Sequence, residues 1–356
     1  MRIGIVGLPN AGKTTLFNAL TRSAAQTAPY PFTTVEPNVA VVEVPEERLE
    51  PVAEAAEASP AIPETIEFRD IAGLVKGAAA GEGLGNRFLA EIRETDAICH
   101  LVRAHGDPQV PHPDGRIDPV ADAEVVETEL LLADLEQAER RLERVRKQAG
   151  SGAREAVTER EWLERVVEAL GSGTSVRDVP VPAAAPGAGQ RLQALSAKPV
   201  LYVANVEEGD SEPPAALVEH AAADDRCIAI SARIEAELAE LPADDAAEMR
   251  ADLGLEGSGL TRLVRAAYGL LDLITFFTAH RGSEARARSL PRGSTAWDAA
   301  GRVHTDIQAG FVRAEVIGWR ELVDAGGYAR ARERGAIRTE GRDYVVRDGD
   351  VVTIRH

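Results

Sequence analysis

Cysteine, aromatic residues and long hydrophobic runs are all scarce in this chain of 356 residues. Its two cysteines, Cys99 and Cys227, are too few for a disulfide framework, and no spacing of Cys and His matches a zinc site. No apolar run reaches the ~18 residues that a membrane-spanning helix needs. The chain goes straight into the apolar run 3–6, without the pattern of a signal peptide. We therefore expect a soluble, cytoplasmic protein.

Positive charge is in the minority, because 40 Lys and Arg face 58 Asp and Glu, a formal net charge of −18. This acidic balance argues against a protein that binds nucleic acid or membranes over its whole surface, although it leaves room for a local basic patch. The length suggests two or three domains, and a hydrophobic content of 44% is enough for a sizeable core.

Short apolar runs alternate with helical stretches over residues 1–126 and 195–271. Alternation of this kind is typical of βα units that form a parallel sheet, so these two ranges are predicted to make one α/β domain. Ligands of such sheets bind near the carboxyl ends of the strands. The predicted strands are Ile3–Val6, Asn38–Val44, Thr65–Asp70, Ala97–Val102, Pro199–Asn205 and Cys227–Ser231.

Residues 127–194 and 272–356 differ from this pattern. In the first range, a heptad-like seam and a second helical pattern over residues 155–170 predict an antiparallel helical hairpin, with a dimerising coiled coil as the alternative. The seam consists of Leu131, Leu135, Ala138, Leu142 and Val145. The second range is predicted to be a small α+β domain with strands at Phe311–Ile317, Tyr344–Val346 and Val351–Ile354.

The strongest motif is Gly-Leu-Pro-Asn-Ala-Gly-Lys-Thr at residues 7–14, which matches the phosphate-binding pattern GxxxxGK[ST]. It follows a predicted strand and precedes a helical run, and this context argues against a chance glycine-rich turn. Lys13 is expected against the β- and γ-phosphates, and the Thr14 hydroxyl is expected to bind Mg²⁺. The backbone predicted to surround the phosphates belongs to Asn10, Ala11, Gly12, Lys13, Thr14 and Thr15.

Further candidate residues follow in the order that a nucleotide switch requires. Thr34, in a Pro-Phe-Thr-Thr segment, is the candidate second ligand of Mg²⁺, although paired threonines also simply favour strands. Asp70 and Gly73 form a D-x-x-G motif at the end of a predicted strand. Asp70 is expected to support the Mg²⁺ shell, and the Gly73 N–H is expected to sense the γ-phosphate. The glycine-rich stretch after Gly73 is either a second switch or a plain flexible loop.

Base recognition is predicted at Asn205-Val206-Glu207-Glu208, after another strand. Guanine-specific GTPases carry N-K-x-D at this point. Val206 stands here at the Lys position and Glu208 at the Asp position, which predicts a purine site with weakened guanine preference. Ser231 is expected to cover the base with its backbone. The alternative is that Asn205 merely caps a turn.

Together these motifs resemble the YchF/Obg-like ATPase family of translation-factor-related P-loop proteins. Further segments carry the resemblance: residues 30–38, 70–78 and 300–306. It implies a Rossmann-like P-loop G-domain, an inserted antiparallel helical domain and a C-terminal TGS domain with a ubiquitin-like β-grasp fold. It also implies hydrolysis of ATP in preference to GTP with Mg²⁺, and association with the ribosome.

The family lacks the glutamine that positions water in ordinary GTPases, and Leu74 occupies that position here. The resemblance implies His112, on a flexible loop, as the catalytic candidate, since a neutral imidazole can orient water. The alternative is a solvent-exposed loop histidine, and three nearby prolines limit its reach. Asn10 resembles the Asn with which related proteins hold K⁺, or it only tolerates a turn conformation.

An arginine cluster in the C-terminal range is the best local candidate for RNA contact, with a solvated basic face as the alternative. Its members are Arg281, Arg286, Arg288 and Arg292. Few aromatic residues accompany it, so base stacking is not indicated. A monomer is favoured. The rival functions are an ordinary GTPase translation factor and a binding module with incidental turnover.

Overall fold

The computed structural model describes residues 1–27, 38–71, 84–107, 110, 112, 115–149, 153–222, 226–255 and 257–356. The chain divides into two compact units. The first comprises residues 1–42 and 67–267, and the second comprises residues 43–66 and 268–356. None of the helices in the described ranges is long and apolar enough to cross a membrane.

A six-stranded sheet forms the centre of the first unit, and its strand order is β2-β4-β1-β5-β6-β7. Every pairing from β4 to β7 is parallel, which confirms the α/β prediction. The carboxyl ends of β1, β5, β6 and β7 therefore lie at one edge. The strands are β1 (Arg2–Val6), β2 (Val39–Glu43), β4 (Thr65–Asp70), β5 (Ala97–Arg103), β6 (Val200–Asn205) and β7 (Cys227–Ile230).

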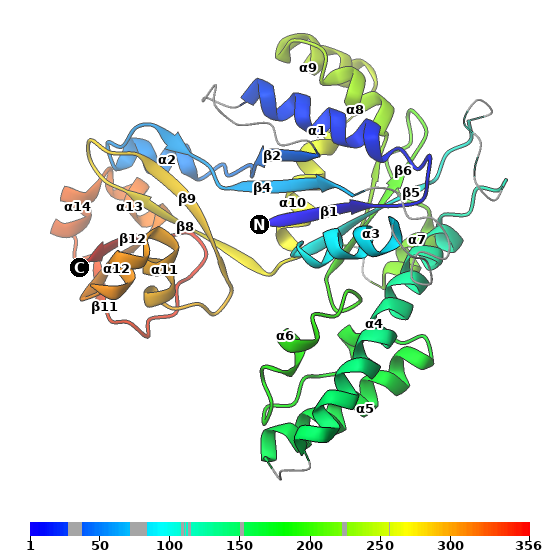
Figure 1. Ribbon diagram of the computed structural model, residues 1–356. Helices are drawn as coiled ribbons and strands as arrows, with labels where there is room; N and C mark the ends of the chain where they lie inside the picture. Colours follow the sequence, from blue (N-terminus) through cyan, green and yellow to red (C-terminus); the bar gives the residue numbers. More distant parts are fainter. Residues whose placement is uncertain are drawn as a thin grey trace. The chain divides into compact units, whose positions relative to one another are not determined.

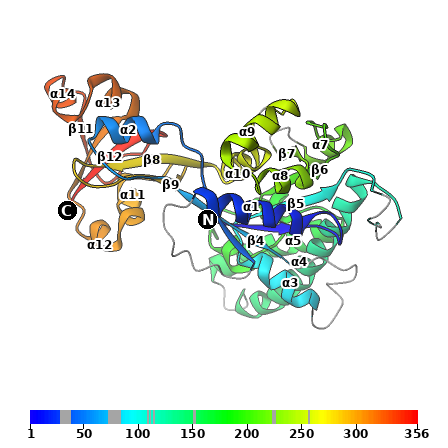
Figure 2. The ribbon, with the colours of Figure 1, turned by 90° about the horizontal axis from the view of Figure 1, so that it is seen from above.

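Helices cover both faces of this sheet (Figures 1 and 2). One face carries α1 (Lys13–Thr27), α8 (Ala232–Leu238) and α9 (Ala243–Asp252); the other carries α3 (Leu84–Arg93) and the start of α4 (Pro119–Ala149). A buried apolar core joins the sheet to α3, α4 and α7 (Ala215–Ala221). At the end of this unit lies α10 (Gly259–Gly269).

The second half of α4 packs against α5 (Arg154–Gly171), with the short η1 (Val176–Asp178) and α6 (Ala188–Leu192) beside them. Their shared core centres on Trp162, whose side chain is fully buried. Polar contacts also join the two helices, because Arg141 donates two hydrogen bonds to Glu159 at 2.8 and 2.6 Å. Both helical patterns expected from the sequence are therefore helices.

The second unit contains another six-stranded sheet, with the order β11-β10-β12-β8-β9-β3 and mixed pairing. β8–β9 and β10–β12 are antiparallel, whereas β12–β8 is parallel. The strands are β3 (Ala61–Ile62), β8 (Leu273–Ala279), β9 (Ala285–Pro291), β10 (Arg313–Gly318), β11 (Arg338–Glu340) and β12 (Asp350–Arg355). The helices are α2 (Leu49–Ala55), α11 (Ala296–Val303), α12 (Thr305–Ala309), α13 (Trp319–Ala325) and α14 (Tyr328–Glu333).

Two details differ from the sequence expectation. The sequence pattern groups residues 43–66 with the nucleotide-binding domain, but they pack with residues 268–356, because the apolar face of α2 joins the core around Phe277. The expected strand Tyr344–Val346 is only an isolated bridge, in which Val345 pairs with Thr295.

Candidate nucleotide-binding site

The loop between β1 and α1 adopts a conformation that its sequence requires. Gly12 has a φ of +101°, which L residues rarely adopt, and a Cβ there would lie 2.4 Å from Asn205 Nδ2. Gly7 is equally constrained, since its Cβ would lie 2.3 Å from the carbonyl oxygen of Leu101. Asn10 supplies a left-handed residue at φ +64°. Glycine therefore occupies the two positions at which the loop comes closest to neighbouring strands, at Leu101 and at Asn205.

Lys13 begins α1, and its side chain turns back over the loop. Its Nζ donates hydrogen bonds to the carbonyl oxygens of Gly7 at 2.8 Å and Leu8 at 2.9 Å. Burial lowers the pKa of Lys13, and the negative charge of Asp70 opposes this shift. The ammonium is thus held by backbone oxygens at the mouth of the loop, where a phosphate would meet it.

Asp70 is the last residue of β4, and it lies opposite Ile5 in the parallel pairing of β4 with β1. Burial is the main cause that raises the pKa of its carboxyl, with Lys13 lowering it and Glu91 raising it. Thr14 is exposed in the first turn of α1. The predicted Thr34 and Gly73 lie outside the described residues, as does Leu74.

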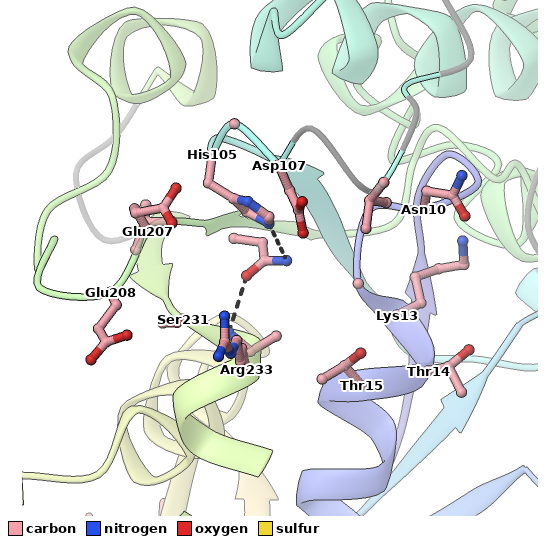
Figure 3. Close-up of a pocket in the computed structure, with 16 residues that line it drawn as sticks. Asn10, Lys13, Thr14, Thr15, His105, Asp107, Glu207, Glu208, Ser231 and Arg233 are labelled. Atoms are coloured by element: carbon pink, nitrogen blue, oxygen red, sulfur yellow. Dashed lines mark hydrogen bonds between the residues drawn. The ribbon is translucent and has the colours of Figure 1, made fainter. Parts of the chain in front are cut away.

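A pocket of about 750 Å³ opens at the carboxyl edge of the sheet (Figure 3). Most of the predicted binding residues line it: Asn10, Gly12, Lys13, Thr14, Thr15, Asn205, Val206, Glu208 and Ser231. Ala11 is buried behind this wall, and it contributes through its backbone carbonyl. The volume is in the range of small-molecule sites.

Asn205, at the end of β6, ties three loops of the pocket together. Its Nδ2 donates to the carbonyl oxygen of Ala11 at 3.0 Å, and its Oδ1 accepts from the backbone N–H of Ala232 at 3.0 Å. His105 Nε2 lies 3.4 Å from the same Nδ2; this bond and the one to Ala232 are dashed in Figure 3. The side chain is buried, so it acts as a clamp between the phosphate loop and the start of α8.

Comparisons with known proteins agree with this geometry. Residues 2–137 match a family model described as a 50S ribosome-binding GTPase, and residues 273–356 match a YchF GTPase C-terminal model described as a protein of unknown function (DUF933). The chain is 45% identical to the ribosome-binding ATPase YchF of Bacillus subtilis (strain 168), over 99% of this chain and 98% of that protein. The chain belongs to the YchF family.

Two further relatives support that membership. The ribosome-binding ATPase YchF of Escherichia coli O157:H7 is 44% identical over 99% of this chain and 98% of its own length. The solved structure of the YchF GTPase of Schizosaccharomyces pombe superposes with a TM-score of 0.87 at 32% identity, covering 100% of this chain and 97% of that one. The α/β fold with a G-domain is therefore shared with YchF proteins.

The pocket of this YchF chain is also lined by the residues that the sequence predicts to face the base, which are Asn205, Val206, Glu208 and Ser231. Val206, at the Lys position, is buried, and its N–H donates to the carbonyl oxygen of Ile230 at 3.1 Å. Glu207 and Glu208 are exposed at the rim of the pocket, as Figure 3 shows. Ser231 precedes α8, and its side chain makes no capping hydrogen bond.

His112 does not line the pocket. Its Nε2 lies 2.8 Å from Asp122 Oδ2 in the first turn of α4, and the two side chains are only 6% and 3% exposed. The expectation of an exposed loop histidine is therefore wrong for this conformation. Pro108, Pro111 and Pro113, which the sequence predicts to limit its reach, lie outside the described residues.

The sequence interpretation missed several pocket residues. His105 and Asp107 follow the end of β5 by two and four residues, and Arg233 lies in the first turn of α8 (Figure 3). The signal that identifies His105 and Asp107 is their place after a strand at the ligand-binding edge. No group of three His, Cys, Asp or Glu side chains in the described ranges could hold a metal ion alone. Magnesium seldom needs such a cage, since phosphates and water complete its shell.

Proposed function

We propose that this chain binds and slowly hydrolyses ATP, in preference to GTP, and acts as a nucleotide-dependent switch that binds the ribosome. The observation that carries the proposal is the pocket that joins the phosphate loop to a base site in which Val206 replaces lysine. Relatives named ribosome-binding ATPase, at 44–45% identity over nearly the whole chain, supply the nucleotide and the partner.

The phosphate end of the pocket would bind the triphosphate through charge and backbone N–H groups. Lys13 would exchange its two carbonyl contacts for β- and γ-phosphate oxygens, and the start of α1 adds a positive potential. Thr14, with Thr34, would hold Mg²⁺, and Asp70 would support its water shell; bound Mg²⁺ would neutralise phosphate charge. These oxygen donors fit Mg²⁺. Gly73 would sense the γ-phosphate, and K⁺ at Asn10 is a further proposal.

The base would lie beside Asn205, Val206 and Ser231. A guanine-selective pocket has a lysine and an aspartate at these two positions. Here the first is Val206, and the second is the longer Glu208, which is exposed at the rim of the pocket. Rejection of GTP then depends on where the Glu208 carboxylate lies: a guanine N–H donor that it does not reach stays unpaired, which costs about 1–3 kcal/mol.

Hydrolysis would be slow for two reasons. Leu74 cannot orient a water molecule by hydrogen bonding, and His112, the candidate for that role, is paired with Asp122. This pairing also favours the second candidate function, a binding module in which turnover is incidental. Stimulation of ATP hydrolysis by ribosomes would support the enzyme, and an unchanged rate would support the module.

The remaining parts of the chain are assigned by proposal. Residues 127–194 would form the inserted helical hairpin domain, and residues 272–356 would form a TGS domain with a β-grasp fold. Either domain would carry an RNA contact on the ribosome. We also propose that the protein is a monomer and works in the cytoplasm.

Equilibrium binding of ATP and GTP to the nucleotide-free protein with Mg²⁺ tests this function. We expect at least a tenfold preference for ATP, which is about 1.4 kcal/mol. A preference for GTP would make the chain an ordinary GTPase. Sedimentation with ribosomes, with ATP, ADP or no nucleotide, tests the partner separately.

A further inference from the structure

A buried arginine lies at the end of β5, next to the nucleotide pocket but not among the residues that line it. Arg103 is only 3% exposed, and the parallel pairing of β5 with β6 places it opposite Asn205. Within the described ranges, the hydrogen bonds of its guanidinium all go to backbone oxygens. Arg103 is therefore a buried charge that is satisfied by the backbone rather than by an acidic side chain.

Each of the three guanidinium nitrogens holds a different residue of the loop that follows β5. Nε donates to the carbonyl oxygen of His105 at 3.1 Å, and Nη2 donates to that of Asp107 at 3.2 Å. Nη1 donates to the carbonyl oxygen of Val110 at 2.7 Å. Arginine suits this arrangement because its donors are spread over a rigid fork, whereas a lysine brings a single nitrogen. The buried charge is costly unless its donors are satisfied, so the guanidinium and the three carbonyl groups stabilise one conformation of the loop.

The loop that Arg103 holds forms one wall of the nucleotide pocket. His105, Gly106, Asp107 and Val110 line the pocket, whereas Arg103 does not. The carbonyl groups of the wall point toward the guanidinium, and Figure 3 shows the side chains of His105 and Asp107 at the pocket. Arg103 therefore acts on the shape of the pocket through the backbone of its wall.

His105 connects this wall to the Asn205 clamp. The amide of Asn205 is oriented by two other bonds, because its Nδ2 donates to the carbonyl oxygen of Ala11 and its Oδ1 accepts from the N–H of Ala232. The atom that faces His105 Nε2, at 3.4 Å, is therefore an N–H donor, and the imidazole nitrogen accepts. The hydrogen bonds that begin at Arg103 are thus continuous with those that hold the phosphate loop.

We infer that Arg103 is a positioning residue for nucleotide binding, which holds His105, Asp107 and Val110 in the wall against which the nucleotide binds. This inference rests on the proposed function, since it requires that the pocket bind a nucleotide. In Figure 3, His105 lies on the side of Glu207 and Ser231, and Lys13 lies on the other side of the pocket. The wall therefore belongs to the base end.

This location predicts which nucleotides depend on Arg103. ATP and ADP share the base and the ribose, and they differ only at the γ-phosphate. Loss of the wall at the base end should therefore weaken both nucleotides by the same factor. Loss of a contact at the phosphate end would instead weaken ATP more than ADP.

The test is equilibrium binding of ATP and of ADP, with Mg²⁺, to the full chain and its variants. Arg103→Ala should lower both affinities by about tenfold or more, and by factors that agree within about threefold. Arg103→Lys should lie between the wild-type chain and Arg103→Ala, because one ammonium replaces three donor nitrogens.

Arg141→Ala is the matched control. The Arg141 guanidinium also donates two hydrogen bonds, but they go to Glu159, and neither residue lines the pocket. This variant should change the affinity for either nucleotide less than about threefold.

Chemical rescue distinguishes positioning of the wall from general support of the fold. Millimolar guanidinium should restore part of the ATP and ADP affinity of Arg103→Ala, because the free ion carries the same forked donors. Ammonium at the same ionic strength should not restore it, and neither ion should raise the affinity of the wild-type chain or of Arg141→Ala. Rescue that fails, or that is equal for the two ions, would show that Arg103 does not act by holding the wall.

Two further results would overturn the inference. They are unchanged ATP and ADP affinity in Arg103→Ala, or an equal loss in Arg141→Ala. A loss confined to ATP would overturn it as well, because it would place the effect at the γ-phosphate. Urea unfolding identifies a variant that does not fold. If Arg103→Ala is such a variant, Arg103→Lys decides, since it keeps the buried charge: an equal loss of ATP and ADP affinity supports the inference, and no loss overturns it.

The same measurements separate this inference from the proposed function. If the wild-type chain prefers ATP and Arg103→Ala binds ATP equally well, the proposed function holds and the role of Arg103 is wrong. If the wild-type chain prefers GTP and Arg103→Ala loses GTP and GDP affinity equally, the role of Arg103 holds and the preference for ATP is wrong. A wild-type chain that binds no purine nucleotide would overturn both.

Discussion

Replacement of Asn205 by alanine is the most direct test of how the pocket is built. The Asn205 amide bonds both to the phosphate loop, at the carbonyl of Ala11, and to the start of α8, at the N–H of Ala232. Alanine would remove both hydrogen bonds and leave a buried carbonyl oxygen and a buried N–H without this partner. We therefore expect the loop and the start of α8 to lose their fixed separation.

The size of the effect follows from the two bonds. Each hydrogen bond contributes about 1 kcal/mol net, and an unsatisfied buried partner adds to the loss, so about 2–3 kcal/mol is expected in total. If the whole of this free energy is lost from the loop conformation that binds ATP, the affinity for ATP falls about 30- to 150-fold. Equilibrium binding of ATP and GTP, with urea unfolding of the free protein, measures both consequences.

Ser231→Ala is the matched control, since Ser231 lines the same pocket but makes no capping hydrogen bond with its side chain. It should change affinity less than threefold. Because Asn205 acts here as a clamp, ATP and GTP should lose affinity equally in Asn205→Ala. Unchanged ATP affinity would refute the clamp, and a ratio of ATP to GTP affinity that shifts more than threefold would show that Asn205 reads the base.

Three further predictions concern turnover, base choice and pH. A catalytic His112 has to leave Asp122 to reach the nucleotide, and in that case His112→Ala should lower ATP turnover about tenfold with ATP affinity unchanged; unchanged turnover would end its catalytic role. The double variant V206K/E208D should shift relative affinity toward GTP by at least tenfold in the same binding assay. Burial lowers the pKa of His100 to about 4, whereas the unfolded chain takes up that proton near 6.5, so stability is lost as pH falls between these values. His100→Phe should remove up to about 3 kcal/mol of that loss, measured by urea unfolding at pH 7 and pH 4.5.

The phosphate loop and the parallel sheet could be predicted because their signals are local. The strand predicted at Ile3–Val6 is β1 at Arg2–Val6, and the one predicted at Pro199–Asn205 is β6 at Val200–Asn205. Each ends in a residue whose place at the carboxyl edge follows from parallel pairing alone. The sequence alone therefore predicts that Asn10 and Asn205 share one pocket.

Contacts between distant segments could not be predicted in the same way. The apolar face of α2 is compatible with either sheet, and only the structure shows that it packs around Phe277 of the second. Likewise, Arg288 and Arg292 look alike in sequence, yet Asp272 pairs with Arg292 and no described carboxylate pairs with Arg288. Which arginine keeps its charge available depends on residues brought close only by folding.

The pairing of His112 with Asp122 lies between these two cases. The heptad-like seam predicted from the sequence starts at Leu131, whereas α4 begins at Pro119. Proline is favoured at the first helical position, and Asp118 caps that end by accepting from the N–H of Ala121 at 3.1 Å. The pair Asp118-Pro119 therefore marks the start of the helix in the sequence, and this start places Asp122 in the first turn of α4. That Asp122 then meets His112 depends on the path of the loop before α4, which no local pattern determines.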